Sequence, residues 1–115
     1  MKNSLKKTKE FKKVYDNKKS YSTKNLVLFI LKNDDMERNR LGISVSHKVG
    51  NSVIRHTLTR RIREIYRANV DNLKKTFDLV VVLRVNSDKA EFFKLNEDFI
   101  YLCKKLGIWD NKDEA

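Results

Sequence analysis

The sequence predicts an α/β (α+β) fold of the two-layer sandwich type, with one small mixed sheet packed by helices in the order α-β-β-β-α-β-α. Along the chain, apolar residues switch between helical spacing and short strand-like runs. A length of 115 residues is enough for one modest core. Proline is absent and glycine occurs three times, which argues against a turn-rich all-β sandwich. We therefore expect residues 1–115 to form a single domain, with loose ends at 1–6 and 108–115.

The first half of the chain is expected to hold one helix and two strands that can be located. Residues 8–16 place apolar side chains at positions i, i+3 and i+4, which is typical of a short helix. Residues 24–32, KNLVLFILK, contain a run that is apolar on both faces, so both faces of this strand should be covered. Residues 40–46, RLGISVS, alternate between apolar and small polar side chains and predict a strand with two different faces.

The second half predicts a helix, a buried strand and a final helix. Residues 52–70 follow an amphipathic helical pattern, and residues 77–85, FDLVVVLRV, indicate a buried strand. Residues 90–106 place their apolar side chains on one helical face. Asp88 begins a D-x-x-E capping pattern with Glu91, and the glycine after this last pattern is suited to ending a helix.

The net charge of +11 is distributed unevenly. Residues 1–25 and residues 38–67 each carry a net charge of +7, whereas residues 86–115 carry −2. Two basic blocks of this size repel themselves, and a polyanionic partner such as a nucleic acid is the natural explanation. An anionic membrane surface is the main alternative, but it would favour a basic helix with no core around it.

Three features of the sequence predict a cytoplasmic protein. The apolar runs are far shorter than the roughly 20 residues that a membrane span needs. The basic N-terminus is followed by no apolar segment, so it does not predict a signal peptide. The single cysteine, Cys103, cannot form an internal disulfide, which fits a reducing compartment.

The predicted helix at residues 52–70 has an apolar arc and a basic arc. The apolar arc, obtained at about 100° per residue, consists of Ile54, Leu58, Ile62 and Ile65. The opposite arc consists of His56, Arg60, Arg63 and Arg67. Among the neighbours on this helix only Glu64 is acidic, so the arginines are not laced into ion pairs of spacing i, i+4. A line of positive groups suits regularly spaced phosphates, although a solvated helix face is the simpler alternative.

The predicted sheet offers a second candidate surface. The small polar face of its second strand consists of Gly42, Ser44 and Ser46. This face would make a poor core but a good floor for a shallow trough. Phe11 and Tyr15 could form one wall of the trough, and Phe29 could lie within it, as in surfaces that stack single-stranded bases. Aromatic residues at i and i+4 are also typical of core packing, so both interpretations stay open at this point.

Three stretches of the sequence resemble a known family. They are EFKKVYDNKKS, LVLFIL and RLGISVSHKVGNSVIRHTLTRRIRE. In order and spacing they look like the protein subunit of bacterial ribonuclease P, over roughly residues 10–85. The third stretch is long enough to be highly specific. The resemblance also implies a rare left-handed β-α-β crossover, against the general rule of right-handed connections.

The resemblance implies that the chain binds a large catalytic RNA, and that the complex removes the 5′ leader from precursor tRNAs. The basic helix and the turn before it would contact the catalytic RNA, with candidate residues Lys48, Asn51, Arg55, Arg60, Arg63 and Arg67. The leader would lie in a cleft between this helix and a sheet face. The candidate residues there, three matching aromatics and two serines of the trough floor, are Phe11, Tyr15, Phe29, Ser44 and Ser46.

The sequence departs from the family pattern at four positions. These are His47, His56, Thr57 and Thr59, where the family usually has lysine, asparagine, arginine and lysine. The signature helix therefore keeps three of its five usual basic positions. Arg61, at a usually apolar position, and Arg67 are candidates to compensate, and we assign no specific RNA contact to positions 56, 57 and 59.

The chain itself offers little for catalysis. Only His47 and His56 could act as acid and base, and no third group is placed by sequence to orient either ring. Two histidines and one distant cysteine match no zinc-binding spacing. We therefore expect no catalytic residue and no metal ligand in this chain, and we expect Mg²⁺ to act with the RNA subunit.

Three function classes stand at the level of sequence: a ribonuclease P subunit, a stand-alone RNA-binding or ribosomal protein, and a small histidine nuclease. The signature block favours the first, which charge alone could not separate from the second. The expected partners are the catalytic RNA and precursor tRNA, with no membrane and no obligate protein partner.

Overall fold

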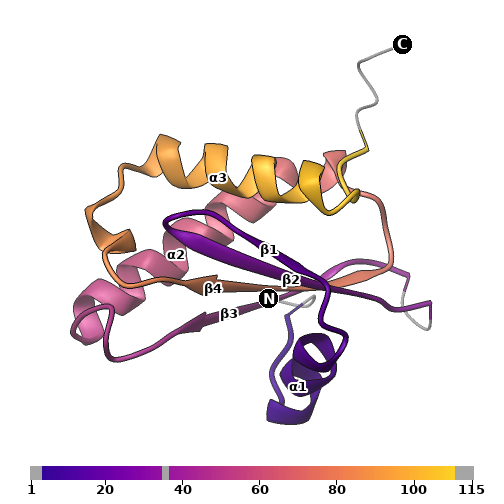
Figure 1. Ribbon diagram of the computed structural model, residues 1–115, viewed down its shortest axis with the longest axis horizontal. Coiled ribbons are helices and arrows are strands. Elements are labelled where there is room, and N and C mark those ends of the chain that lie inside the picture. The colour runs from indigo at the N-terminus through magenta and orange to yellow at the C-terminus, as the bar shows by residue number, and fades with distance from the viewer. Residues whose placement is uncertain (1–3, 35–36, 111–115) are drawn as a thin grey trace.

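The structure is a computed structural model that describes residues 4–34 and 37–110. Four strands form one sheet in the order β1-β2-β4-β3. The strands are β1 (Ser20–Ser22), β2 (Leu26–Lys32), β3 (Arg40–Val45) and β4 (Phe77–Leu83). The helices are α1 (Thr8–Asp16), α2 (Ser52–Asn69) and α3 (Phe92–Lys105). In Figure 1, α2 and α3 cover one face of the sheet and α1 lies against the other. The predicted fold class and the order α-β-β-β-α-β-α are confirmed.

The two central strands, β2 and β4, face two different groups of apolar residues. Leu28 and Val81 pair across these strands and belong to the main core, beneath α2 and α3. The next pair, Phe29 and Val80, points to the opposite face and packs in a smaller cluster with Val14 of α1. This arrangement explains why β2 is apolar on both faces: helices cover it from both sides.

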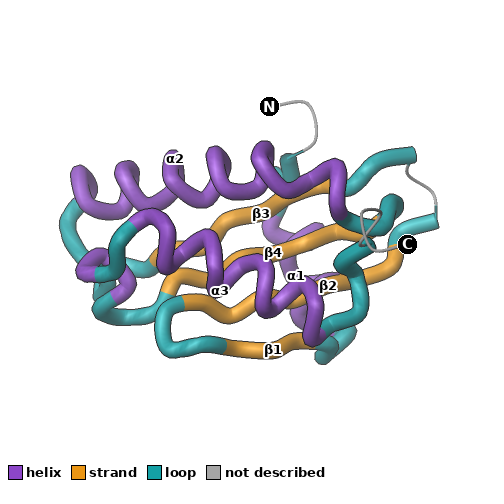
Figure 2. Tube along the Cα trace, turned by 90° about the horizontal axis from the view of Figure 1, so that it is seen from above, coloured by secondary structure: helices purple, strands orange, loops and turns teal. Residues whose placement is uncertain are grey.

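The connection from β3 through α2 to β4 is left-handed. The two strands pair in parallel, and α2 lies above the sheet in Figure 1. Figure 2 looks at the sheet from the side of α2. With both strands pointing up in that view, β4 lies to the left of β3. The structure therefore agrees with the handedness that the family resemblance implied, and it departs from the general preference for right-handed crossovers.

Most element boundaries agree with the prediction. Helix α1 has the predicted bounds, and α2 ends at Asn69, where a short 3₁₀ turn (Val70–Asn72) follows. Gly107 directly follows the last turn of α3 with a φ of 76°, a left-handed conformation that ends helices. Strand β1 could not be located from the sequence, because its three residues are all exposed and have no periodicity. No helix within the described ranges is long and apolar enough to cross a membrane.

The predicted capping pattern before α3 is wrong. Asp88 lies in a separate 3₁₀ turn (Ser87–Lys89), and α3 begins only at Phe92. Glu91 is the N-cap residue, and its side chain makes no capping hydrogen bond. The reason is tertiary: Ala90 packs against the main core with an extended backbone, at φ −78° and ψ 142°, which separates Asp88 from the helix.

The expectation of loose ends is also wrong where the structure describes them. Leu5 is 5% exposed and Ile108 is 1% exposed. Backbone hydrogen bonds tie both residues to neighbouring segments. Burial of an apolar side chain at each end thus extends the fold beyond the predicted elements. Residues 1–3 and 111–115, which belong to the same expectation, lie outside the described residues.

Candidate nucleic-acid interface

Helix α2 turns an apolar side to the core and a basic side to solvent. Its buried residues are Leu58, Ile62, Ile65, Tyr66 and Asn69. The residues of the opposite arc are all exposed and are called the basic stripe here: His56, Arg60, Arg63 and Arg67. No ion pair within the described residues includes a member of the stripe. The positive charge of the stripe is therefore available for phosphate groups, which arginine binds with two parallel hydrogen bonds.

The turn before α2 is shaped by two of the predicted RNA-binding residues. Asn51 caps the helix, because its Oδ1 accepts a hydrogen bond from the Ile54 backbone N–H at 3.0 Å. The Nε of Arg55 donates to the Gly50 carbonyl oxygen at 3.2 Å. Lys48 is exposed in the same turn. Asn51 and Arg55 thus have a structural role here, whether or not they also contact RNA.

Of the four positions that depart from the family pattern, His56 belongs to the stripe and His47 lies in the turn before α2, while Thr57 and Thr59 are partly buried residues of α2. The hydroxyls of Thr57 and Thr59 donate to the carbonyls of Val53 and Arg55, each at 2.9 Å. Both threonines therefore bond back to the preceding helical turn. Arg61, a candidate for compensation, is only partly exposed, whereas Arg67 is an exposed member of the stripe.

The three predicted leader-binding aromatics, called the aromatic cluster here, lie together on the α1 side of the sheet. The rings of Tyr15 and Phe29 meet edge to face, with centroids 4.9 Å apart. Phe11 lies directly on Gly42, where a Cβ atom would stand only 2.7 Å from the ring Cζ. All three aromatic side chains are partly buried. They pack as core residues and still present part of their surface to solvent.

The residues of the aromatic-cluster row are Phe29, Val80 and Gly42. The next row of side chains on the same sheet face is more accessible to solvent. Val27, Val82 and Ser44 lie side by side in this row. Each of them is partly exposed, and we call them the open row. Ser46, the next residue of that face, is exposed. A shallow depression of about 550 Å³ continues from Val27 and is lined by Ser20, Tyr21, Ser22, Val27 and Arg84. Of the predicted trough floor, Ser44 and Ser46 are accessible beside the aromatic cluster, whereas Gly42 is buried beneath Phe11.

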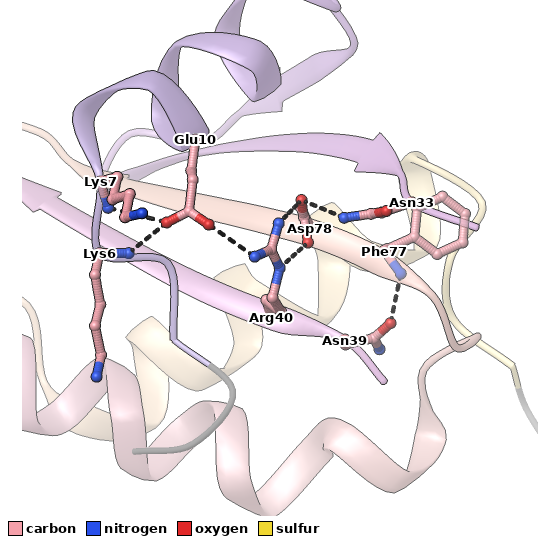
Figure 3. A network of polar contacts seen from close by, with 8 residues as sticks. All are labelled: Lys6, Lys7, Glu10, Asn33, Asn39, Arg40, Phe77 and Asp78. Atoms are coloured by element: carbon pink, nitrogen blue, oxygen red, sulfur yellow. Dashed lines mark hydrogen bonds and ion pairs between the residues drawn. The ribbon is translucent and has the colours of Figure 1, made fainter. Parts of the chain in front are cut away.

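A network of charges, called the polar clamp here, ties α1 to the sheet (Figure 3). The Nε and Nη2 of Arg40 donate to the two carboxylate oxygens of Asp78, at 2.9 and 2.8 Å. Its Nη1 donates to Oε2 of Glu10 at 2.8 Å. The other oxygen of Glu10 accepts from the backbone N–H groups of Lys6 and Lys7, at 3.1 and 2.9 Å. One guanidinium thus joins a helix carboxylate to a strand carboxylate.

The electrostatics of the clamp follow from these bonds. The backbone N–H groups of Lys7 and Lys6, together with the guanidinium of Arg40, lower the pKa of Glu10 to about 2. The hydrogen bonds to Asp78 raise the pKa of Arg40 above its usual value. The sequence analysis missed this network. Its signal was the one carboxylate within the apolar strand β4, because a buried charge of this kind needs a partner.

The two candidate surfaces lie on opposite faces of the sheet. The basic stripe is carried by α2, whose inner side is filled by the main core. The aromatic cluster and the open row lie on the face that carries α1. A leader cleft directly between α2 and the sheet, as the resemblance implied, is therefore not where the aromatic residues lie. Strand β3 connects the two sides of the sheet, because its Gly42 contacts Phe11 and its chain continues through Ser46 into the turn before α2.

The groups considered for catalysis are not assembled into a site. His47 and His56 are exposed, and neither has a hydrogen bond or ion pair within the described residues. Burial raises the pKa of the Cys103 thiol to about 12, so this group stays protonated at neutral pH. In the described ranges, no three His, Cys, Asp or Glu side chains come together as a possible metal site.

A small α+β domain with a basic helix that forms no ion pairs on its exposed stripe and with partly exposed aromatic rings belongs, by its fold and surfaces, to the class of RNA-binding proteins. The sequence model of the family described as ribonuclease P matches residues 1–107. The chain belongs to the ribonuclease P protein family. Proteins of this family are the RNA-binding components of a ribonucleoprotein endoribonuclease that processes the 5′ ends of tRNAs, and the predicted function is confirmed at this level.

Relatives and solved structures support the assignment along almost the whole chain. The ribonuclease P protein component of a Clostridium botulinum strain is 48% identical, over 94% of this chain and 97% of that protein. The protein component from Natranaerobius thermophilus is 42% identical, over 89% and 88% of the two chains. The Staphylococcus aureus RNase P protein structure matches with a TM-score of 0.86 at 25% identity, over 93% and 97% of the chains. The structure of the Thermotoga maritima RNase P protein matches with a TM-score of 0.80 at 31% sequence identity, over 89% of this chain and 96% of that chain.

Proposed function

We propose that the protein divides RNA binding between the two faces of its sheet. The α2 side, with the basic stripe and the turn holding Lys48, Asn51 and Arg55, binds the catalytic RNA. The α1 side, with the aromatic cluster, Ser44 and Ser46, binds the single-stranded 5′ leader of precursor tRNA. The observation that carries this proposal is the placement of the charged and aromatic surfaces on opposite faces of one small sheet.

The chemistry of each surface supports its assignment. Exposed arginines without acidic partners gain affinity by releasing counterions from a folded RNA, whatever its sequence. Partly exposed aromatic rings beside a small polar floor suit unpaired bases, because every base has a face that stacks. A folded RNA presents phosphates but few free bases, whereas a leader presents both. The basic stripe therefore fits the catalytic RNA better, and the aromatic cluster fits the leader better.

We propose that the protein contributes positioning and charge neutralisation, and that the chemical step belongs to the RNA subunit with its Mg²⁺. The described residues hold no cluster of metal-ligating side chains that would carry such an ion in the protein. We therefore propose no step on a protein-bound metal. The expected setting is the cytoplasm, with the catalytic RNA and precursor tRNA as partners and without an obligate protein partner.

The division of labour can be tested with single-residue variants in the reconstituted holoenzyme. Arg60→Ala and Arg63→Ala should weaken assembly with the RNA subunit and lower its salt dependence by about one phosphate contact each. Phe11→Ala and Phe29→Ala should leave assembly intact. They should weaken the binding of precursor relative to mature tRNA by about 1–3 kcal/mol per lost stack.

Circular dichroism melts control for folding, because Phe11 and Phe29 also pack in the structure. Equal losses of assembly from folded arginine and aromatic variants would show one undifferentiated RNA surface. The catalytic assignment has its own test: the purified chain is incubated with precursor tRNA, with and without the RNA subunit. Specific 5′ cleavage by the protein alone would contradict it.

A further inference from the structure

The attachment of α1 to the sheet has an apolar part and a polar part. The apolar part consists of Phe11 on Gly42 and of Tyr15 against Phe29. Contacts of this kind hold the helix close to the sheet, but they are non-directional and permit small rotations. The polar part, the clamp, is directional because it consists of charge-assisted hydrogen bonds at 2.8–2.9 Å.

The strand end of the clamp is rigid. Asp78 is 3% exposed and receives two hydrogen bonds from Arg40 as well as one from the Asn33 side chain at 3.0 Å. This pairing fixes the plane of the guanidinium relative to the sheet. Its Nη1 therefore points in one direction, toward the first turn of α1, as Figure 3 shows.

The helix end of the clamp lies next to the aromatic cluster. Glu10 precedes Phe11 in α1, and Arg40 lies two residues before Gly42 in β3. Glu10 also accepts hydrogen bonds from the two backbone N–H groups at the start of the helix, so both oxygens of its carboxylate are held by hydrogen bonds. A rotation of α1 that broke the bond to Arg40 would move Phe11 across Gly42 and change how the rings border the open row.

We infer that Glu10 is a positioning residue for leader binding. Through Arg40 and Asp78 it holds α1 in the orientation in which Phe11 and Tyr15 border the open row. This inference rests on the proposed role of the aromatic cluster. It assigns to Glu10 no contact with RNA, and a carboxylate would in any case repel the phosphates of a leader.

The decisive variant is Glu10→Gln, and Asp16→Asn is its matched control. Both carboxylates belong to α1, and each substitution removes one negative charge. Asp16 pairs with Lys12 on the exposed side of the helix, at 2.7 Å, rather than with the sheet. Glu10→Gln should reduce the preference of the holoenzyme for precursor over mature tRNA by about threefold to tenfold. Asp16→Asn should leave the preference unchanged, and both variants should assemble normally with the RNA subunit.

A second variant separates position from charge. Glu10→Asp keeps the negative charge but is one methylene shorter, so it cannot reach both Arg40 and the backbone N–H groups. It should reduce the preference for precursor over mature tRNA as much as Glu10→Gln does. It also replaces Glu10→Gln in the experiment if that variant folds poorly. A double-variant cycle with Phe11→Ala tests the route. If Glu10 acts by placing Phe11 and Tyr15, then Glu10→Gln should have a clearly smaller effect on the preference once Phe11 is removed, because only the contribution of Tyr15 remains, whereas a merely structural role would give additive losses.

The outcomes distinguish the positioning role of Glu10 from the proposed binding of the leader by the aromatic cluster. If Phe11→Ala lowers the preference and Glu10→Gln behaves like Asp16→Asn, the positioning role is overturned and the leader site stands. Additive losses in the cycle also overturn it. If Phe11→Ala leaves the preference unchanged, the leader site itself fails, and the positioning role fails with it.

Discussion

The basic stripe and the aromatic cluster lie on opposite sides of the same small sheet, and they are built differently. The side chains of the stripe are exposed and make no ion pair within the described residues. The rings of the aromatic cluster are partly buried and pack on the strands beneath them. Changes in the stripe should therefore leave the fold intact, whereas changes in the aromatic cluster should affect both folding and the proposed leader binding.

The largest effect on stability is expected from removing Arg40, the residue through which the polar clamp holds α1 on the sheet. Arg40→Met would leave the carboxylate of Asp78 buried without its guanidinium, and we expect a loss of about 3 kcal/mol in the free energy of unfolding. Lys12→Met is the control, because it breaks only an exposed pair with Asp16 and should cost less than about 1 kcal/mol. Urea unfolding of both variants measures the difference. Similar losses would show that the clamp does not anchor α1.

A smaller effect is expected from filling the contact between Phe11 and the sheet. In Gly42→Ala the new Cβ would stand 2.7 Å from the Phe11 ring, so the ring must move. We expect a destabilisation of about 1–3 kcal/mol together with a lower preference for precursor tRNA. Ser44→Ala, in the open row beside it, is the control for stability. Thermal melts and tRNA binding are measured on the same samples, and an unchanged melt for Gly42→Ala would contradict the close contact.

The acid dependence of stability should separate the two sides further. The pKa of Glu10 is lowered from 4.5 to about 2 in the folded protein. A lowered pKa means that the carboxylate stabilises the fold fully above about pH 4.5, and that this contribution disappears as the pH falls toward 2. The difference in melting temperature between the wild type and Glu10→Gln should therefore be constant from pH 6 to pH 8. It should shrink below pH 4.5, and a difference that persisted at pH 2 would contradict the assignment.

The smallest effect on stability is expected from the basic stripe. Arg60→Ala and Arg63→Ala remove exposed side chains, so each should change the free energy of unfolding by less than about 0.5 kcal/mol. Each substitution also lowers the self-repulsion of the basic block, which offsets part of any loss. Thermal melts at low and high salt provide the measurement. A loss comparable to that of Gly42→Ala would mean that the stripe contributes to the fold and would remove the contrast between the surfaces.

Local sequence patterns were sufficient to predict those helices and strands whose buried side chains recur at the spacing of the element itself. The bounds of α1, the apolar arc of α2 and the two-sided burial of β2 could all be predicted, because each depends on the spacing of a few neighbouring residues. The same method failed at β1, which is exposed and short, and at Asp88, where core packing of Ala90 overrides a local capping pattern. It also missed the packed chain ends, since burial of Leu5 and Ile108 depends on distant partners.

The candidate site likewise has features that local sequence patterns predict and features that depend on distant contacts. By itself the sequence determined which residues are basic, aromatic or small and which side of an element carries them, because helical and strand periodicity act locally. Its long signature also determined the family. Only the tertiary structure decided that the basic and aromatic surfaces lie on opposite faces of the sheet. It alone brought Arg40 to Glu10 and Asp78, which are 30 and 38 positions away in the chain. Such contacts depend on strand order and crossover handedness, and no local spacing of residues encodes these.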